Sequence, residues 1–385
     1  MTGALRIGFI PLVDAAALIV AVDNGFTASE GLDVALVREV SWSKVRDKLN
    51  IGLFDAAHLL APVAIASSLG IGHVKVPISA PLNLGVNGNA ITVSPALHAE
   101  LMASLEGDRF DPMATALALA RVVAERRKDG AEPLTFAMTF PFSTHNYQLR
   151  FWMAAGGVDP DEDVRLVVLP PPYMVDSLAS GQVDGFCVGA PWNSIAVDQG
   201  HGHILHFGSD ILGHAAEKVL ALRQSWAEKN PDVVAALVRA CARGAAFIET
   251  NRTEAAAILA QPERIGVAAE IIQLTLEGRL KISSEGTVRE SVRYLLVGQE
   301  AARPDPVQAA WLYSQMVRWG QTPLSAGALR IAMGVFRQDI YETIFGPTTG
   351  QNDGKDGIGA FTGPPFDPAD IAGHLNAFAI GRWKA

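Results

Sequence analysis

The strongest constraint on the fold is an alternation of strand-like and helix-like segments that begins within the first ten residues. Residues 5–11 (LRIGFIP) form an apolar run with the length of a buried strand. Residues 15–24 have helical character, residues 32–40 are again strand-like, and residues 41–50 form a predicted helix with Ser41 at its N-cap. Because helices separate consecutive strands, the pattern predicts a parallel α/β sheet.

The same alternation returns in the middle of the chain and gives way to helices near residue 218. Further predicted strands cover 56–60, 74–81, 90–93, 134–139, 164–169 and 185–188, and further helices cover 62–69, the segment ending at 156, 174–179 and the segment starting at 191. Longer helices are predicted at 232–250 and 268–276, and the Gly/Pro-rich segment 346–368 is expected to form a surface loop or strap.

Two α/β units followed by returning helices predict two lobes with a cleft between them. We expect residues 1–93 together with 207–385 in one lobe, and residues 94–206 as the inserted second lobe. At 385 residues the chain has the length for two lobes of ordinary size.

The overall charge disfavours some partners and sets a requirement for others. With a formal net charge of −9, the chain is expected to avoid nonspecific binding to nucleic acid and to anionic membranes, and a small anion would need a local positive pocket. The apolar run 15–22 is far shorter than a bilayer span, and the start MTGALRIGFIP lacks the features of a secretory leader. The two separated cysteines, Cys187 and Cys241, are expected to be buried thiols, so we expect a cytoplasmic protein.

The motifs of common catalytic and cofactor sites are missing from the sequence. It contains no GxGxxG or GxxxxGK[ST] loop, no GxSxG elbow, and no HExxH or CxxC. His201, His203 and His206 form the most metal-like group, but His206 would point away from the other two on a strand, and no carboxylate stands at a matching spacing. We therefore expect a solvated strand edge there, no metal, no cofactor, and a binding protein rather than an enzyme.

The positions directly after predicted strands are where an α/β sheet holds its ligands. This rule selects residues 11–16, 40–42, 139–145 and 189–193. The stretch TFPFSTHNYQLRFWMAAGG places His145 where a strand leads into a helix, and helix N-termini favour anions. From the residues alone, His145 is either a surface residue at a helix start or a group aimed into the cleft.

A series of segments spread over nearly the whole chain carries a family resemblance. These segments are IGFIPLVDAAALIVA, SWSKVRDKL, DAAHLLAP, NGNAITVS, STHNYQLRFWMAAGGVDPDEDV, VVLPPPYMV, DGFCVGAPWN and EKVLALRQSW, in that order. They resemble the nitrate/bicarbonate solute-binding proteins of the NrtA/CmpA type. The resemblance implies a two-lobed periplasmic-binding-protein fold of type II, with the ligand cleft between the lobes and extra C-terminal helices.

The resemblance also implies a ligand site. Nitrate-binding members hold the anion with a tryptophan, an amide, a histidine and a lysine, which fall here on Trp42, Asn89, His145 and Lys218. Two positions depart from the family pattern: Asn89 stands where Gln is frequent, and Ala190 stands where DGFCVGEPWN has Glu. The missing carboxylate at 190 suits a lone anion and weakens the case for bicarbonate held with a metal.

The chemistry of nitrate agrees with these side chains. Nitrate sheds water to enter a cleft, so it needs donors around its rim and a positive potential. Lys218 offers an ammonium and His145 an N–H at a helix start, while Asn89 offers a neutral donor and Trp42 an N–H or an apolar wall. We therefore expect a small cationic niche formed by His145 and Lys218, with protonation of the histidine coupled to anion binding.

Five further residues are expected close to the ligand. Ser143 and Thr144 are expected to cap the helix, with backbone N–H groups that reach the ligand. Trp192 either contacts the ligand or supports the cleft. The whole set of secondary contacts is Pro11, Ser143, Thr144, Gly189 and Trp192.

Three functions remain open at this point. A start without a leader makes the chain similar to NasS-type nitrate sensors, which implies nitrate or nitrite as ligand and a NasT-type RNA-binding antiterminator as the partner that is sequestered until the ligand arrives. The alternative is the substrate-binding component of a nitrate/bicarbonate ABC transporter. An enzyme similar to thiamin-pyrimidine synthases would need a Cys-rich iron motif, which Cys187 and Cys241 do not provide.

Overall fold

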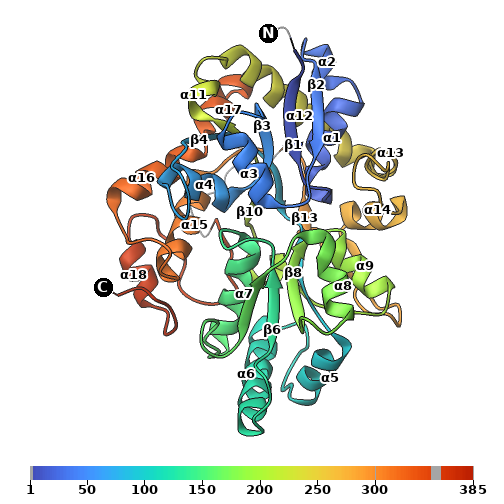
Figure 1. Ribbon diagram of the computed structural model, residues 1–385, viewed down its shortest axis with the longest axis vertical. Coiled ribbons are helices and arrows are strands. Elements are labelled where there is room, and N and C mark those ends of the chain that lie inside the picture. Colours follow the sequence, from blue (N-terminus) through green and yellow to red (C-terminus); the bar gives the residue numbers. More distant parts are fainter. Residues whose placement is uncertain (1–2, 300, 348–356, 385) are drawn as a thin grey trace.

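The computed structural model describes residues 3–299, 301–347 and 357–384. The chain builds two lobes, each around one mixed sheet flanked by helices (Figure 1). In the first sheet β1 pairs in parallel with β2 and β3, whereas β10 is antiparallel to both β3 and β4. In spatial order its strands are β13 (Leu295–Leu296), β4 (Ile78–Asn87), β10 (Ala216–Arg223), β3 (Ala56–Leu60), β1 (Leu5–Phe9) and β2 (Val34–Arg38).

The second sheet is also mixed. Its central β6 is parallel to β7 and β8, and β5 is antiparallel to β8 and β9. The strands, in spatial order, are β7 (Arg165–Val168), β6 (Thr135–Met138), β8 (Gly185–Gly189), β5 (Asn89–Val93) and β9 (His203–Phe207). The expected parallel pairing holds for β1–β3 and for β6–β8. It fails for β4, β5, β9 and β10, the strands on which the chain passes between the lobes, because these pair antiparallel with their neighbours.

The connection from the first lobe to the second is held by Asn87, whose backbone φ is positive. Asn87 has a φ of 60° and Gly88 a φ of 92°, and together they separate β4 from β5. The Asn87 side chain donates to the carbonyls of Gly213 and Arg293 and accepts from the N–H of Ala215. The outgoing and returning connections are thus bonded to each other where the lobes meet.

The domain boundaries expected at 93/94 and 206/207 stay a prediction. In terms of the sheets, β5 already lies in the second sheet, so the crossing occurs at Asn87 and Gly88. A hairpin of β11 (Arg279–Lys281) and β12 (Val288–Glu290) also reaches the second lobe, where the Ile204 N–H donates to the Ile282 carbonyl.

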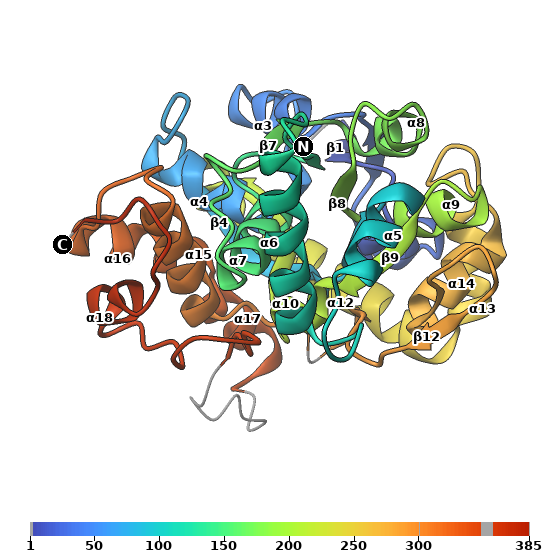
Figure 2. The ribbon, with the colours of Figure 1, turned by 90° about the horizontal axis from the view of Figure 1, so that it is seen from below.

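Helices cover both sheets, and those of the C-terminal third form two groups. Figure 2 shows α15, α16 and α18 on one flank of the molecule and α13 and α14 on the opposite flank. Before β10 the helices are η1 (Val13–Ala15), α1 (Ala16–Asp23), α2 (Phe26–Ser29), α3 (Trp42–Asn50), α4 (Ala61–Leu69), α5 (Pro95–Ala103), α6 (Pro112–Lys128), α7 (Thr144–Ala155), η2 (Pro171–Tyr173), α8 (Met174–Ala179), α9 (Trp192–Asp198) and α10 (Gly208–Ile211). After it come α11 (Gln224–Ala227), α12 (Pro231–Thr250), α13 (Arg252–Leu259), α14 (Ala269–Glu277), α15 (Pro306–Arg318), α16 (Ala326–Val335), α17 (Gln338–Phe345) and α18 (Ile371–Asn376).

Local signals explain several helix boundaries. The Ser41 side chain accepts from the N–H of Lys44 at the start of α3, and Ser143 accepts from the N–H of Asn146 at the start of α7. Both serines satisfy a backbone donor that would otherwise lack a partner. The N-cap predicted at Ser41 and the cap predicted at Ser143 are confirmed.

Part of the segment expected as a loop or strap lies along the junction. The N–H of Gly213 donates to Gly359 at 2.8 Å, and the N–H of His214 donates to Ile358 at 2.9 Å. The N–H of Phe361 donates back to Ile211 at 3.0 Å. Residues 357–361 are therefore a strap across the returning connection, whereas 348–356 of the expected 346–368 lie outside the described residues.

Two expectations from composition can be compared with the fold. Cys187 and Cys241 are free and buried, which confirms the prediction of buried thiols. Within the residues that the structure describes, no helix has the length and apolar character that crossing a membrane requires.

Helices α1 and α12 pack closely at a glycine. An added Cβ on Gly244 of α12 would lie 2.3 Å from the carbonyl oxygen of Ala17. Gly244→Ala is therefore expected to lower the free energy of unfolding by about 1–3 kcal/mol, because the two backbones must separate. Urea unfolding followed by circular dichroism measures the change.

Gly334→Ala is the matched control for this contact. Gly334 lies in α16, and its added Cβ would meet no atom within 4 Å. Alanine is expected to leave stability unchanged or raise it by up to about 1 kcal/mol, because a helical glycine loses more backbone entropy on folding. Equal effects of the two substitutions would contradict close packing at Gly244.

Candidate functional site

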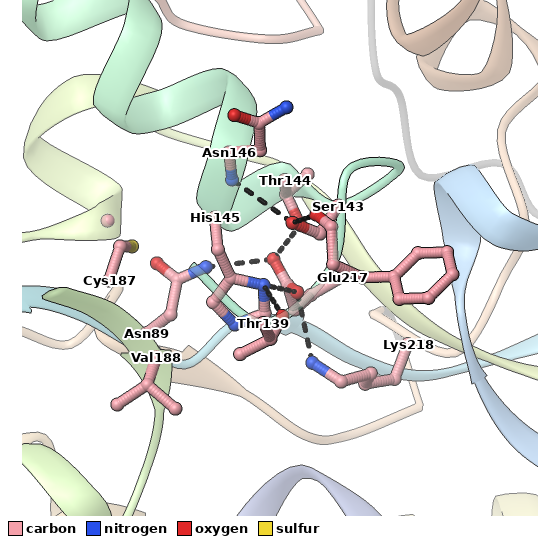
Figure 3. A network of polar contacts seen from close by, with 12 residues as sticks. Asn89, Thr139, Ser143, Thr144, His145, Asn146, Cys187, Val188, Glu217 and Lys218 are labelled. Carbon is pink, nitrogen blue, oxygen red and sulfur yellow. Dashed lines mark hydrogen bonds and ion pairs between the residues drawn. The ribbon is translucent and has the colours of Figure 1, made fainter. Parts of the chain in front are cut away.

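A group of buried polar side chains lies where the two sheets meet (Figure 3). The first lobe contributes side chains from η1, α3, β3 and β10, and the second contributes side chains from β5 and the start of α7. Each member is at most 1% exposed: Asp14, Trp42, His58, Asn89, Thr144, His145, Glu217 and Lys218. Burial of this many polar groups requires that they bind one another or a ligand.

The carboxylate of Glu217 is the centre of the group. Its Oε2 accepts from Asn89 Nδ2 at 2.8 Å and from the Thr144 hydroxyl. Its Oε1 lies 3.2 Å from His145 Nδ1 and 3.0 Å from Lys218 Nζ. Asn89, Thr144 and His145 belong to the second lobe and Glu217 to the first, so this carboxylate links the lobes (Figure 3).

Lys218 extends the group into the first lobe. Its Nζ lies 2.8 Å from Asp14 Oδ2, and Asp14 Oδ1 lies 3.0 Å from His58 Nε2. The ammonium is 5.3 Å from the centre of the Trp42 ring, which is a cation–π distance. Trp42 also packs against the His58 ring at 5.4 Å between centres. Trp42 is therefore an aromatic wall beside the charged pair.

A β-bulge explains why neighbours in sequence both reach this site. Successive side chains on a regular strand point to opposite faces. On β10, Ala216 pairs with Val86 and Lys218 pairs with Gly85, so two steps on β10 oppose one step on β4. The register shift at Glu217 is what places its carboxylate 3.0 Å from the ammonium of Lys218.

Two glycines allow the backbone to approach these side chains closely. An added Cβ on Gly208 would lie 1.8 Å from Asn89 Oδ1, so only glycine leaves room for the amide at this point. An added Cβ on Gly189 would lie 3.4 Å from Asp14 Oδ2 and 3.6 Å from Leu12. Gly189, expected near the ligand, therefore adjoins the site through Asp14.

Burial and charge set the protonation states. Burial by itself raises the pKa of Asp14, but the Lys218 ammonium and His58 bring that pKa down to about 2. Burial lowers the pKa of Lys218, but the carboxylates of Asp14 and Glu217 outweigh it and hold the pKa above its usual value. Burial lowers the pKa of His145 to about 4, although Glu217 opposes this, and burial likewise lowers the pKa of His58. At neutral pH both imidazoles are neutral.

The tautomer of His145 follows from its neighbours. His145 Nδ1 lies 3.2 Å from a Glu217 oxygen and 3.2 Å from the Thr139 hydroxyl. The carboxylate only accepts hydrogen bonds and the hydroxyl can also accept, so a proton on Nδ1 suits both neighbours. His145 Nε2 is then an acceptor, and it is buried without a hydrogen-bond partner. Among the described residues, three other atoms of the site are also buried without a hydrogen-bond partner: Trp42 Nε1, Asn89 Oδ1 and His58 Nδ1. A buried polar group without a partner is costly, so a ligand that reached these atoms could gain by bonding to them.

The charge of the site differs from the expectation. His145 and Lys218 do meet at a single oxygen, but that oxygen belongs to Glu217. With Asp14 and Glu217 as carboxylates, Lys218 as ammonium and neutral imidazoles, the formal charge is −1. The expected cationic niche is thus wrong, because the carboxylates of Glu217 on β10 and Asp14 on η1 together outweigh the lysine.

Comparison with known proteins places this site in a family. The family model described as the NMT1-like family matches residues 2–262. The chain belongs to the NMT1-like family. Its relatives include the nitrate/nitrite binding protein NrtA of Synechococcus elongatus, 30% identical over 397 residues that cover 99% of this chain and 87% of NrtA. The nitrate import ATP-binding protein NrtC of Synechocystis sp. is 33% identical over 389 residues, 98% of this chain and 55% of NrtC, so the chain spans about half of that relative.

Solved structures agree with this membership of the NMT1-like family. The periplasmic nitrate-binding protein NrtA from Synechocystis PCC 6803 superimposes with a TM-score of 0.88 at 26% identity, over 98% of both chains. The alkanesulfonate-binding protein SsuA from Xanthomonas axonopodis pv. citri has a TM-score of 0.57 at 18% identity, over 84% of this chain and 97% of SsuA, and shows the fold alone.

Several expectations are thereby confirmed for this NMT1-like chain. The two-lobed periplasmic-binding-protein fold of type II is confirmed, and so is the resemblance to NrtA-type proteins. The relatives of NrtA type are named as binding proteins, which confirms the expectation of a binding protein rather than an enzyme. The narrower likeness to NasS-type sensors is not tested by these comparisons and stays a prediction.

Three further residues were expected close to the ligand, namely Thr144, Pro11 and Trp192. Thr144 does not cap α7; it is the first residue of the helix, and its hydroxyl donates to Glu217. Pro11 is buried directly after the loop residue that follows β1. Trp192 is half-buried at the start of α9 and packs in the apolar core of the second lobe, which favours support of the cleft over ligand contact.

The solvated strand edge expected at 201–206 is present in part: β9 is the edge strand of the second sheet, and His201 and His203 are partly exposed. His206 is fully buried on β9 and lies 2.6 Å from the Thr115 hydroxyl. His203 stacks on His98 at 4.2 Å between ring centres. His201 precedes the strand altogether. The expectation is wrong for His206, because α6 covers this end of β9 and Thr115 of α6 meets the ring. Among the described residues, no group of three or more His, Cys, Asp or Glu could hold a metal ion.

Sequence reasoning missed three residues of the site, namely Asp14, His58 and Glu217. Each is a polar residue in or beside a largely apolar run: PLVDAAALIV, DAAHLLAP and HAAEKVLAL. A charged or ionisable side chain in a buried strand or helix rarely lies there unless it is paired. That signal was present in the sequence, but it does not say which residues form the pairs.

The buried neutral imidazole of His145 predicts how stability depends on pH. Its pKa is about 4 in the folded protein and near 6.5 when unfolded, so between these values the unfolded chain binds more protons. Its contribution is complete above pH 6.5 and is lost as the pH falls towards 4, to the extent of about 3 kcal/mol. Urea unfolding at pH 7.5 and 5.0 should show a lower free energy at pH 5.0, and a shallower pH dependence in His145→Gln. An unchanged pH dependence in the variant would contradict a neutral His145.

Proposed function

We propose that this protein binds nitrate or nitrite between its lobes, at the donors that surround Glu217. One observation carries the proposal: donors from both lobes, Asn89 Nδ2, the Thr144 hydroxyl, His145 Nδ1 and Lys218 Nζ, converge on one planar oxyanion group. The relatives named as nitrate/nitrite binding proteins support the choice of ligand.

The chemistry of a carboxylate is close to that of the proposed ligand. Carboxylate, nitrate and nitrite are planar groups with delocalised negative charge on two or three oxygens, and all accept hydrogen bonds in the plane. A set of N–H and O–H donors that binds one therefore has the geometry to bind the others. The start of α7 adds positive potential, because Thr144 and His145 are its first two residues.

The proposed binding mode couples the ligand to the arrangement of the lobes. Lys218 belongs to the first sheet, while Asn89 and His145 belong to the second lobe. An anion that contacts all three residues binds the closed arrangement more tightly than an open one. It therefore stabilises the closed arrangement by the difference between these two binding free energies. A binding event between lobes can in this way be transmitted to the surface.

We further propose, on the resemblance to NasS-type sensors, that this coupling serves regulation in the cytoplasm. The partner would be a NasT-type RNA-binding antiterminator that binds the anion-free protein and is released when nitrate binds. Decisive release requires that nitrate bind one state more tightly than the other by several kcal/mol. A nearly complete change of population requires a difference in binding free energy of about 5.5 kcal/mol. The competing proposal is a substrate-binding component of a nitrate/bicarbonate ABC transporter.

A pull-down distinguishes these two roles. The tagged full chain is recovered from cells grown without and with nitrate. A sensor should bring down an RNA-binding antiterminator only from nitrate-free cells, because the ligand stabilises the arrangement that releases it. Recovery of membrane transporter subunits alone, in both conditions, would contradict the sensor role and favour the transporter.

Calorimetric titration with nitrate, nitrite and bicarbonate tests the ligand. We expect nitrate to bind the wild type with a submillimolar Kd, about 5 kcal/mol or more. Lys218→Ala and Asn89→Ala should each weaken binding at least tenfold, because each removes a donor to the anion. Lys281→Ala is the control, since Lys281 pairs with Asp198 on the surface away from the site.

Circular dichroism of each variant distinguishes a loss of binding from a loss of folding. A folded Lys218→Ala protein that binds nitrate as tightly as the wild type would contradict the site. A wild type that binds bicarbonate but not nitrate would contradict the choice of ligand.

A further inference from the structure

Glu217 connects the two lobes through the donors proposed for the external anion. Its main chain belongs to β10 in the first sheet, whereas Asn89 lies on β5 and His145 on α7. The hydrogen bond from Asn89 Nδ2 is 2.8 Å long, and His145 Nδ1 lies 3.2 Å from the carboxylate. The protein thus makes to itself the bridging contacts that a ligand between lobes would make (Figure 3).

The carboxylate leaves few of these donors available. The neutral His145 ring has a single N–H, and its Nδ1 already lies 3.2 Å from both Glu217 and the Thr139 hydroxyl. Lys218 Nζ is shared between Glu217 and Asp14, and the Thr144 hydroxyl has only one hydrogen, which it donates to Glu217. An incoming anion that uses the same donors must take them from the carboxylate.

Charge strengthens this competition. Glu217 is fully buried, and so are Asp14 and Lys218, so solvent screens their charges little. A second anion in contact with the carboxylate would meet a like charge in a medium of low dielectric constant. The carboxylate and the external anion therefore exclude each other from the ring of donors.

We propose that Glu217 is an internal ligand of this site, which occupies the place of the anion, supplies part of the bridging between the lobes in its absence, and is displaced when an external anion binds. This inference rests on the proposed function. Glu217 would then set the anion concentration at which the protein responds, because the free energy needed to displace its carboxylate reduces the apparent affinity for the anion.

Nitrate titrations of two variants test the competition. Glu217→Gln keeps the size of the side chain and removes its charge, and it is expected to bind nitrate at least tenfold more tightly than the wild type at pH 7.5. Glu342→Gln is the matched control, because Glu342 is a surface residue paired with Arg303 and its loss changes the net charge equally. It should bind nitrate as the wild type does.

Acetate provides a chemical replacement for the internal ligand. In Glu217→Ala the missing atoms are those of one acetate ion, so acetate is expected to bind this variant and to compete with nitrate there much more strongly than in the wild type, where Glu217 already occupies the place. Small-angle scattering without anion should show a larger radius of gyration for Glu217→Ala than for the wild type. Nitrate or acetate should restore the smaller value.

The results separate this inference from the proposed function. A wild type that binds nitrate, together with a folded Glu217→Gln that binds it equally or less tightly, overturns the internal ligand and leaves the function intact. If Glu217→Gln does not fold, a Glu217→Ala that binds nitrate but not acetate has the same consequence. Absence of nitrate binding in the wild type and in both variants overturns the function itself.

Discussion

The structure depends on a buried carboxylate that is bound from both lobes. Glu217 receives hydrogen bonds or charge from Asn89, Thr144, His145 and Lys218, which come from three separate parts of the chain. Taking these groups out of water is costly, and only mutual pairing compensates for it. The two sheets are therefore set relative to each other by polar contacts of defined geometry as well as by apolar packing.

The backbone around the site is shaped to make those contacts. The bulge on β10 points Glu217 and Lys218 into one site, and Gly208 leaves room for the amide of Asn89. Asn87, with its positive φ, ties the outgoing and returning connections together beside them. Bulges and positive-φ residues interrupt regular pairing, and their clustering here is consistent with a position where function requires local departures from it.

The candidate site could be predicted in part. His145 was found because a histidine at a helix start after a strand is a typical anion position, and Trp42, Asn89 and Lys218 followed from the family resemblance. Asp14, His58 and Glu217 were missed, and the site was expected to be positive. The sequence analysis expected helices from about residue 218 and did not predict the strand β10, and only the register between β10 and β4 shows the bulge at Glu217.

The sequence by itself determined the α/β class, the helix starts at Ser41 and Ser143, and the burial of both cysteines, because these follow from local periodicity, capping and apolar context. The tertiary structure decided the antiparallel strands at the crossing, the burial of His206 and the charge of the site. Each of these depends on which distant segments pack together. Electrostatics in a buried site is a sum over partners, and the linear sequence does not specify those partners.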